Sequence, residues 1–148
     1  MTTDPAQRSK PGGVCKFCQI ASGELAADIV CSDHDVVAFL DVRPVFKGHV
    51  LVVPRRHVDN LIDLPPELLV PLFGTTQRIA AAVVAGLEAD GSFVAINNVV
   101  SQSEPHLHVH VVPRRRKDGL RGFFWPRQRY DDDAERADYA ARIAAALT

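Results

Sequence analysis

Three histidines occupy every second position of one short apolar segment. In His106–Val112, His106, His108 and His110 alternate with leucine and valine. Because successive side chains of a β-strand point to opposite faces, a strand here would gather the three imidazoles on one face and the aliphatic side chains on the other. Imidazoles can act as nucleophiles, proton carriers or metal ligands near neutral pH. The alternation therefore predicts one reactive face and one core face.

Three explanations fit this histidine row. The histidines could be incidental residues on a half-exposed strand. They could be metal ligands, because strand positions i and i+2 can both reach one zinc ion whose open site activates water. One imidazole could also attack phosphorus directly, held in the right tautomer by a neighbouring group. This last chemistry requires phosphate-binding groups nearby.

Side chains that can hold phosphate oxygens precede the row. Amide and hydroxyl groups occur at Asn97, Asn98, Ser101, Gln102 and Ser103. Their side chains and backbone can donate hydrogen bonds to an anion. Beyond the row, residues 114–129 contain seven basic residues and one acid. That run is either a cluster of solvated surface charges or a basic region that attracts an anionic substrate.

The cysteines favour a metal site or reduced thiols over disulfides. Three cysteines form no even disulfide framework. Cys15 and Cys18 form a Cys-x-x-Cys pair, and with the distant His57 and His106 they supply the ligand types of a tetrahedral structural zinc site. The alternative is a pair of packed thiols. Cys31 has no partner and is expected to be a small buried hydrophobic residue.

Hydrophobic patterning predicts the elements that position these residues. The predicted strands are a hairpin from Asp28 with Val36–Asp41 as its second strand, then His49–Pro54, Phe93–Asn98 and His106–Pro113. A central helix is expected within Leu64–Gly91, with a kink or a late start at Pro71. A C-terminal helix is expected within Asp131–Thr148. This order indicates an α+β domain on an antiparallel sheet of about five strands.

Composition bounds the remaining choices. With 148 residues, 47% of them hydrophobic, the chain suits one domain over residues 14–148 preceded by a flexible tail over 1–13. A formal net charge of −1 gives no general attraction to nucleic acid or to an anionic membrane. No secretory run and no apolar stretch of roughly 18 residues is apparent. We therefore expect a cytoplasmic protein without nucleic-acid or membrane partners.

Taken together, these segments resemble the histidine-triad (HIT) superfamily, specifically its Hint-like branch. The histidine row follows Gln102-Ser103 as it does in that family. The other matching segments, in family order, are Phe17 with Ile20, Ala38–Val42, Lys47–His57 and Trp125-Pro126. The resemblance covers roughly Cys15 to Trp125 and implies a HIT-like fold.

The resemblance also implies how the row would act. His108 would attack the α-phosphorus of a nucleotide and become transiently nucleotidylated before water releases the nucleoside monophosphate. The backbone carbonyl of His106 would orient His108, and His110 would help neutralise phosphate oxygens. Asn97 and Ser103 would hold the phosphate, with Ser103 near the leaving group.

The rest of the nucleotide site follows by the same resemblance. Asp41 would accept hydrogen bonds from the ribose hydroxyls, and Gln102 belongs to the expected nucleotide-binding set. The residues expected to wall the base pocket are Phe17, Ile20, Phe39 and Val42. Zinc-carrying relatives resemble this chain at Cys15, Cys18, His57 and His106, which would then hold a structural zinc ion. No organic cofactor is expected.

The predicted function is hydrolysis or transfer at the α-phosphate of purine nucleotides, in particular adenine nucleotides such as nucleoside phosphoramidates. A diadenosine polyphosphate hydrolase would use the same residues on a longer substrate. From other classes, the chain could be a zinc-dependent hydrolase with the histidine row as ligands, or a nucleotide-binding regulator with little turnover. The resemblance further implies a homodimer in which two sheets join.

Overall fold

The computed structural model describes residues 14–121 and 127–148. The chain forms two compact units, one ending at Asp118 and one beginning at Gly119. The predicted tail over 1–13 and the Trp125-Pro126 match lie outside the described residues. The prediction of a single domain over 14–148 stays a prediction.

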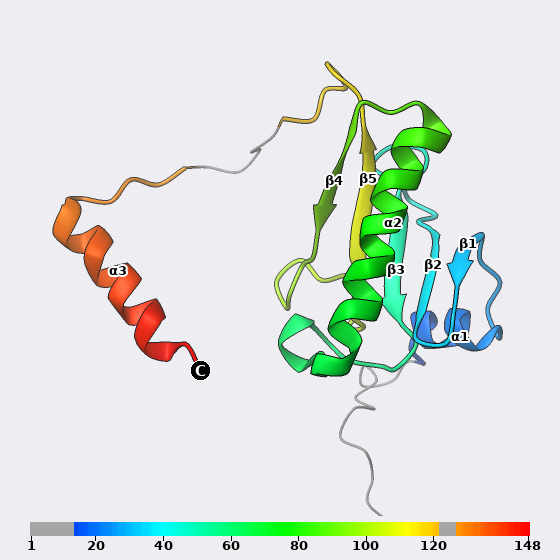
Figure 1. The fold of residues 1–148 in the computed structure, drawn as a ribbon, viewed down its shortest axis with the longest axis horizontal. Helices are drawn as coiled ribbons and strands as arrows, with labels where there is room; N and C mark the ends of the chain where they lie inside the picture. The colour runs from blue at the N-terminus through cyan, green and yellow to red at the C-terminus, as the bar shows by residue number, and fades with distance from the viewer. Residues whose placement is uncertain (1–13, 122–126) are drawn as a thin grey trace, which may run out of the picture. The chain divides into compact units, whose positions relative to one another are not determined.

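The first unit contains a five-stranded antiparallel sheet (Figure 1). Its strands are β1 Ile29–Ser32, β2 Val36–Leu40, β3 Val50–Pro54, β4 Gly91–Ala95 and β5 Val109–Arg114. Their order across the sheet is β1-β2-β3-β5-β4. Asp33 closes the first hairpin by accepting the N–H groups of Asp35 and Val36, both at 2.9 Å. The predicted α+β class and antiparallel sheet are confirmed.

The histidine row extends beyond the strand that was predicted to hold it. β5 begins at Val109, not at His106, and its pairing with β3 stops where Val109 lies opposite Val52. Past that point, side-chain and loop contacts replace the strand ladder. Nε2 of His106 donates to the Pro54 carbonyl at 2.8 Å, and the N–H of Leu107 donates to the Val58 carbonyl at 2.8 Å.

The central helix starts late, as Pro71 suggests. Two short 3-10 helices, Leu61–Asp63 and Pro66–Leu68, precede α2, which spans Leu69–Leu87. Pro71 lies in the first turn of α2, where its missing N–H costs no helical hydrogen bond. Glu88 caps the end of the helix, and its φ of 53° lies in the left-handed region.

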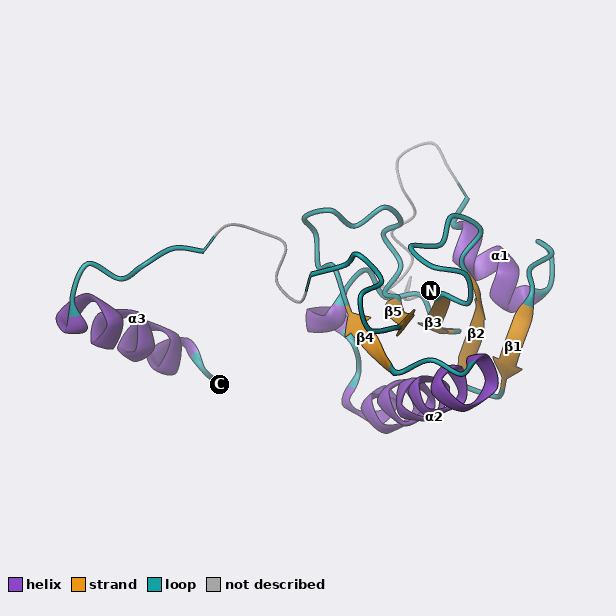
Figure 2. Cartoon of the chain, turned by 90° about the horizontal axis from the view of Figure 1, so that it is seen from above, coloured by secondary structure: helices purple, strands orange, loops and turns teal. Residues whose placement is uncertain are grey.

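Two hydrophobic clusters sandwich the sheet. α2 covers one face, and the short helix α1, Lys16–Ser22, lies on the other (Figure 2). The cluster between α2 and the sheet includes Leu72, Ile79 and Val83 of α2 and Val36, Ala38, Val50, Val52, Val109 and Val111 of the strands. The α1 side buries Phe17, Val37, Phe39, Leu51 and Val53. Alternate positions of each strand therefore serve opposite layers, and each such fully buried side chain contributes about 1.5–3 kcal/mol.

One expectation about apolar length is wrong. Pro66–Leu87 is, by length and composition alone, long and apolar enough to cross a membrane, with a mean hydropathy of 1.5, within the residues that the structure describes. A core helix of a globular domain meets the same criterion. In this fold the helix packs Leu72, Ile79 and Val83 against the sheet.

Gly48 allows a close approach between α2 and the start of β3. Its φ of 96° lies in the left-handed region, which glycine adopts without steric cost. A Cβ at this position would overlap Cδ1 of Leu87, the last residue of α2. The next residue along the chain is His49.

The second unit contains the predicted C-terminal helix, α3, at Asp133–Ala146. Asp132 caps its first turn by accepting the N–H of Glu135 at 2.7 Å.

Candidate active site

The histidine row lies on the α1 face of the sheet. His110 pairs with Leu51, whose side chain belongs to the α1-side cluster, while Val109 and Val111 enter the core beneath α2. The predicted alternation is therefore confirmed. His106 and His108 are buried, with 0% and 3% of their surface exposed.

His108 is held in one tautomer. Its Nδ1 lies 2.8 Å from the carbonyl oxygen of His106. A carbonyl can only accept, so Nδ1 carries the proton and Nε2 keeps its lone pair. The Phe17 ring lies edge-on to the imidazole, with centroids 5.1 Å apart. The backbone contact expected of His106 is present, and it leaves Nε2 as the ring nitrogen of His108 with an available lone pair.

A relay of hydrogen bonds orients His110. The N–H of Val45 donates to Nδ1 of His49 at 3.2 Å, so the proton of His49 sits on Nε2. That nitrogen lies 2.9 Å from Nδ1 of His110 and donates to it. His110 therefore carries its own proton on Nε2. The sequence analysis placed His49 at the start of a strand and gave it no role in the site, and the structure brings it into the site.

Burial keeps this relay uncharged. Burial is the main cause that lowers the pKa of His110 to about 4, and the neighbouring His108 and His49 lower it further. Burial also lowers the pKa of His49, against the opposing charge of Asp41. Nε2 of His110 is buried and has no hydrogen-bond partner among the described residues. An unpaired buried donor costs about 1–3 kcal/mol, which a phosphate oxygen would relieve.

In the polar loop over residues 97–103, some of the polar side chains already form hydrogen bonds within the fold. Oδ1 of Asn98 accepts the N–H of Leu61 at 2.9 Å. Nε2 of Gln102 donates to the Asp59 carbonyl, and its Oε1 accepts the N–H of Val99 at 3.0 Å. Two of the five expected phosphate-binding side chains are therefore already engaged within the fold.

The two residues expected to hold phosphate, Asn97 and Ser103, are exposed at either end of this loop. Between them, Val99 and Ser101 adopt φ angles of 67° and 61°. Such left-handed conformations cost non-glycine residues about 1–3 kcal/mol each and persist only where surrounding contacts hold them.

The expected base-pocket residues divide into two groups. Phe17 and Phe39 are buried, with ring centroids 5.4 Å apart, and Ile20 packs beside them. Val42 is 90% exposed and lies outside that cluster. The carboxylate of Asp41 lies 3.7 Å from Nδ1 of His49, at the edge of the histidine site.

Four side chains from distant parts of the chain converge beside the row. Cys15, Cys18, His57 and His106 bring one ligand atom each to within 4.8 Å of the others. Sγ of Cys18 lies 3.3 Å from Nδ1 of His57 and 3.5 Å from Nδ1 of His106. A tetrahedral zinc ion with Zn–S near 2.3 Å and Zn–N near 2.0 Å separates its sulfur and nitrogen ligands by about 3.5 Å. The cluster therefore fits a tetrahedral metal ion.

Contacts behind the ligands point both imidazoles at this centre. Nε2 of His57 lies 3.0 Å from a carboxylate oxygen of Asp59, and Nε2 of His106 donates to Pro54. Both Nδ1 lone pairs are thus free for a metal, an arrangement typical of ligating histidines. Burial raises the pKa of Cys18 to about 12, so a bound cation is what would hold its thiolate.

The first residues of the basic run stabilise the fold. Arg114 pairs with Asp118 through contacts of 2.6 and 3.0 Å, and this bond raises the pKa of the Arg114 guanidinium. Arg115 donates to the carbonyl of Leu87 at 2.6 Å, at the end of α2.

Cys31 differs from the expected small buried hydrophobic residue. It is partly buried, and its sulfur accepts a hydrogen bond from the Arg78 guanidinium at 3.2 Å.

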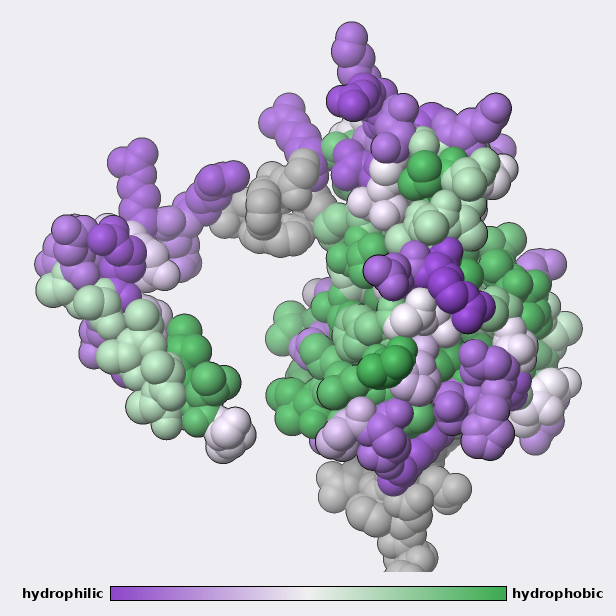
Figure 3. Space-filling model, in the orientation of Figure 1, coloured by the Kyte–Doolittle hydropathy of each residue, from purple (hydrophilic) through white to green (hydrophobic). Residues whose placement is uncertain are grey.

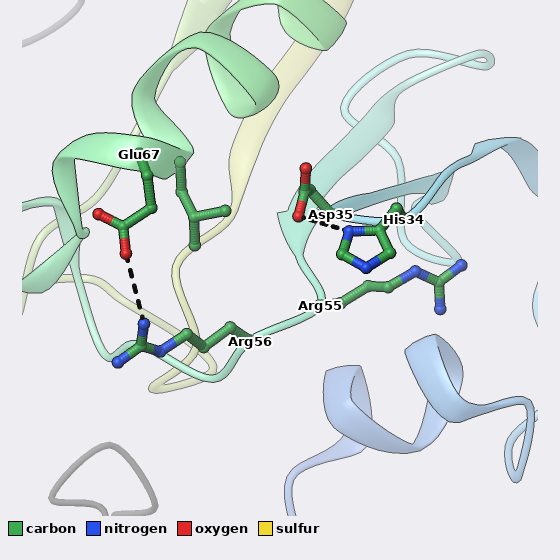
Figure 4. Close-up of a pocket in the computed structure, with 6 residues that line it drawn as sticks. His34, Asp35, Arg55, Arg56 and Glu67 are labelled. Carbon is green, nitrogen blue, oxygen red and sulfur yellow. Dashed lines mark hydrogen bonds and ion pairs between the residues drawn. The ribbon is translucent and has the colours of Figure 1, made fainter.

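A separate surface hollow shares no residue with the histidine row (Figure 4). Its charged groups pair with one another: His34 lies 3.0 Å from Asp35, and Arg56 lies 3.8 Å from Glu67. The Arg55 guanidinium donates to the carbonyls of Asp33 and Ala21 and to Ser32. These Arg55 contacts tie α1 to the first hairpin.

Comparison with known proteins gives consistent matches. Residues 22–117 match the family described as HIT domain. An uncharacterized HIT-like protein of Mycobacterium tuberculosis is 43% identical over 72% of this chain and 75% of its own length. The adenosine 5′-monophosphoramidase of Saccharomyces cerevisiae is 32% identical over 89% and 82%. The asymmetrical bis(5′-nucleosyl)-tetraphosphatase of Schizosaccharomyces pombe is 37% identical over 55% and 46%.

Solved structures agree with the fold. A HIT family protein from Bacillus subtilis has a TM-score of 0.83 at 34% identity, covering 90% of this chain and 97% of that one. A zinc-bound histidine triad family protein from Mycobacterium smegmatis has a TM-score of 0.69 at 38% identity, with the same two coverages. The relatives thus include nucleotide hydrolases and a zinc-bound protein.

Proposed function

This chain belongs to the histidine-triad (HIT) family, and from that premise we propose that it hydrolyses adenine nucleotides at the α-phosphate through a nucleotidyl-histidine intermediate. Nucleoside phosphoramidates are the proposed substrate class, as they are for the yeast relative by its name. The observation that carries the proposal is the tautomer of His108, whose bond to the His106 carbonyl leaves Nε2 free to attack.

The reaction proceeds in two displacements. Nε2 of His108 attacks the α-phosphorus, a nitrogen–phosphorus bond forms, and the bond from phosphorus to the leaving amine breaks. The amine takes a proton as it leaves, and Ser103 is the proposed donor. Water then attacks the same phosphorus and breaks the bond to His108, and the proton that the water loses restores the Ser103 hydroxyl as AMP forms.

The remaining residues bind and orient the nucleotide. The Nε2–H of His110, held by the His49 relay, donates to a non-bridging phosphate oxygen. Asn97 and Ser103 hold the phosphate, and Asp41 accepts from the ribose. The proposed base contacts are Phe17, Ile20, Phe39 and Val42. Gln102 acts in this set from the loop that it also braces.

Zinc is the proposed occupant of the cluster at Cys15, Cys18, His57 and His106. The spacing of the sulfur and nitrogen atoms supports it, as does the zinc-bound relative. A closed four-ligand site of this kind supplies a structural cross-link when the metal is bound.

The proposed location is the cytoplasm. The three cysteines form no disulfide, and reduced thiols of this kind suit a reducing compartment, which subcellular fractionation would test.

Product analysis tests the substrate class. We expect the protein to release AMP from adenosine 5′-phosphoramidate at least about tenfold more efficiently, by kcat/KM, than it cleaves diadenosine tetraphosphate. Faster cleavage of the tetraphosphate would favour the alternative that the fission yeast relative represents. Tight AMP binding without turnover of either compound would instead indicate a regulator.

A homodimer is the proposed assembly. Phe73, Val84 and Leu87 are exposed apolar side chains of α2, and β4, which carries the exposed Val94, is an edge of the sheet. Figure 3 shows broad hydrophobic surface on the face of the first unit that is in view. An unpaired edge beside apolar surface is typical of an interface. We expect Phe73→Glu to convert a dimer into a monomer in sedimentation equilibrium, whereas Gln128→Glu leaves the mass unchanged. A wild-type protein that sediments as a monomer would contradict the proposal.

A further inference from the structure

The segment His57–Leu61 lies between the metal cluster and the polar loop. On the cluster side, Nδ1 of His57 lies 3.3 Å from Sγ of Cys18, and its Nε2 lies 3.0 Å from the carboxylate of Asp59. Asp59 therefore determines how the His57 ring faces the cluster. A hydrogen bond from the second ring nitrogen of a metal-binding histidine commonly changes the affinity of the site for its metal.

The same segment holds the loop on its other side. The backbone carbonyl of Asp59 accepts Nε2 of Gln102, and the N–H of Leu61 donates to Oδ1 of Asn98 at 2.9 Å. Gln102 then reaches back across the loop to accept the N–H of Val99 at 3.0 Å. One residue, Asp59, thus contacts a candidate metal ligand with its side chain and a loop side chain with its backbone.

The loop needs this support. Val99 and Ser101 both have positive φ angles, and Val99 is a β-branched residue, for which that conformation is unusual. The side-chain bonds to Asp59 and Leu61 therefore offset a backbone cost. If those bonds weaken, the loop that ends at Ser103 relaxes.

We propose that Asp59 and Gln102 are positioning residues that couple the Cys15–Cys18–His57–His106 metal site to the loop over 98–103. The inference rests on the proposed function, because it takes the cluster as a zinc site and the loop as the phosphate-binding segment. Metal at the cluster orders the loop through His57, Asp59 and Gln102. Since coupling between two sites is reciprocal, loosening the loop also weakens metal binding.

Zinc affinity measures the coupling without any substrate. The full-length protein competes for zinc with a chromogenic chelator, as wild type, Gln102→Ala and Val100→Ala. Gln102→Ala removes both side-chain bonds of Gln102 and leaves all four candidate ligands in place. We expect it to weaken zinc binding by about fivefold or more, the lower end of common couplings between sites. Val100→Ala, at an exposed side chain of the same loop, should change the affinity by less than about twofold.

Hydrogen exchange gives the reciprocal measurement on wild type alone. Chelation of zinc should speed amide exchange over residues 98–103 by about fivefold or more, while α2 keeps its protection. Equal zinc affinity in wild type and Gln102→Ala, or unchanged loop exchange on chelation, overturns the coupling. A protein that binds no zinc overturns the proposed metal site instead. Failure to release AMP from a protein that passes both tests would overturn only the proposed reaction.

Discussion

Replacing His108 with alanine is expected to lower the rate of AMP release from adenosine 5′-phosphoramidate by at least about 10³-fold, the scale of losing a catalytic nucleophile. Brief acid quench followed by intact-protein mass spectrometry should show an adenylyl adduct on wild type and none on the variant. The physical reason is that, in the proposed reaction, the unprotonated Nε2 of His108 is the atom that forms the bond to phosphorus.

A matched control distinguishes the loss of the nucleophile from the loss of any histidine side chain. His34 lies in the turn of the first hairpin with its side chain 97% exposed, and His34→Ala should keep wild-type turnover and the adduct. Equal AMP release by wild type and His108→Ala would remove His108 as the nucleophile. Metal-activated water would then become the leading mechanism.

Removing metal from the cluster is expected to cost stability. A ligand that binds only the folded state at 1,000 times its Kd stabilises by about 4 kcal/mol. For a chain of this size, about 3 °C of Tm accompanies each kcal/mol. Chelation of the zinc-loaded protein should therefore lower Tm by about 10 °C or more in a thermal melt, and Cys18→Ser should reproduce that loss together with the loss of bound zinc.

Cys31→Ser provides the control for the loss of a thiol, because Cys31 lies outside the four-residue cluster. It should retain one zinc per chain and most of the wild-type Tm. A Tm that does not respond to chelation would indicate two packed thiols rather than a metal site. If chelation stopped turnover while Tm stayed constant, the zinc would be catalytic and the structural assignment would be wrong.

Local sequence patterns predicted those features of the fold that depend on neighbouring residues in the chain. The alternation from His106 to Val112 gave the face of each side chain, because a strand has a fixed period of two. Pro71 indicated the late start of α2, because proline tolerates a first helical turn. The cysteine pair and two histidines, which ligand type and the resemblance to zinc-carrying HIT proteins grouped together, lie side by side in the structure.

Features that depend on distant contacts escaped prediction. α1 is only seven residues long, and its N-cap is a cysteine sulfur, which is not among the usual capping side chains. His49 enters the site because β3 pairs with β5 in a register that sets Leu51 opposite His110. Neither that register nor the contacts of Gln102 with Asp59 leave a local signal in the sequence.

Gly48 has two roles, one in packing and one in placing a residue of the histidine site. It packs against the end of α2, and it is followed directly by the histidine that orients His110. A side chain there would displace the end of the Leu87 side chain, and it would strain the left-handed backbone directly before His49. A substitution at Gly48 is therefore limited by the packing at the end of α2, and its backbone strain falls next to the residue that orients His110.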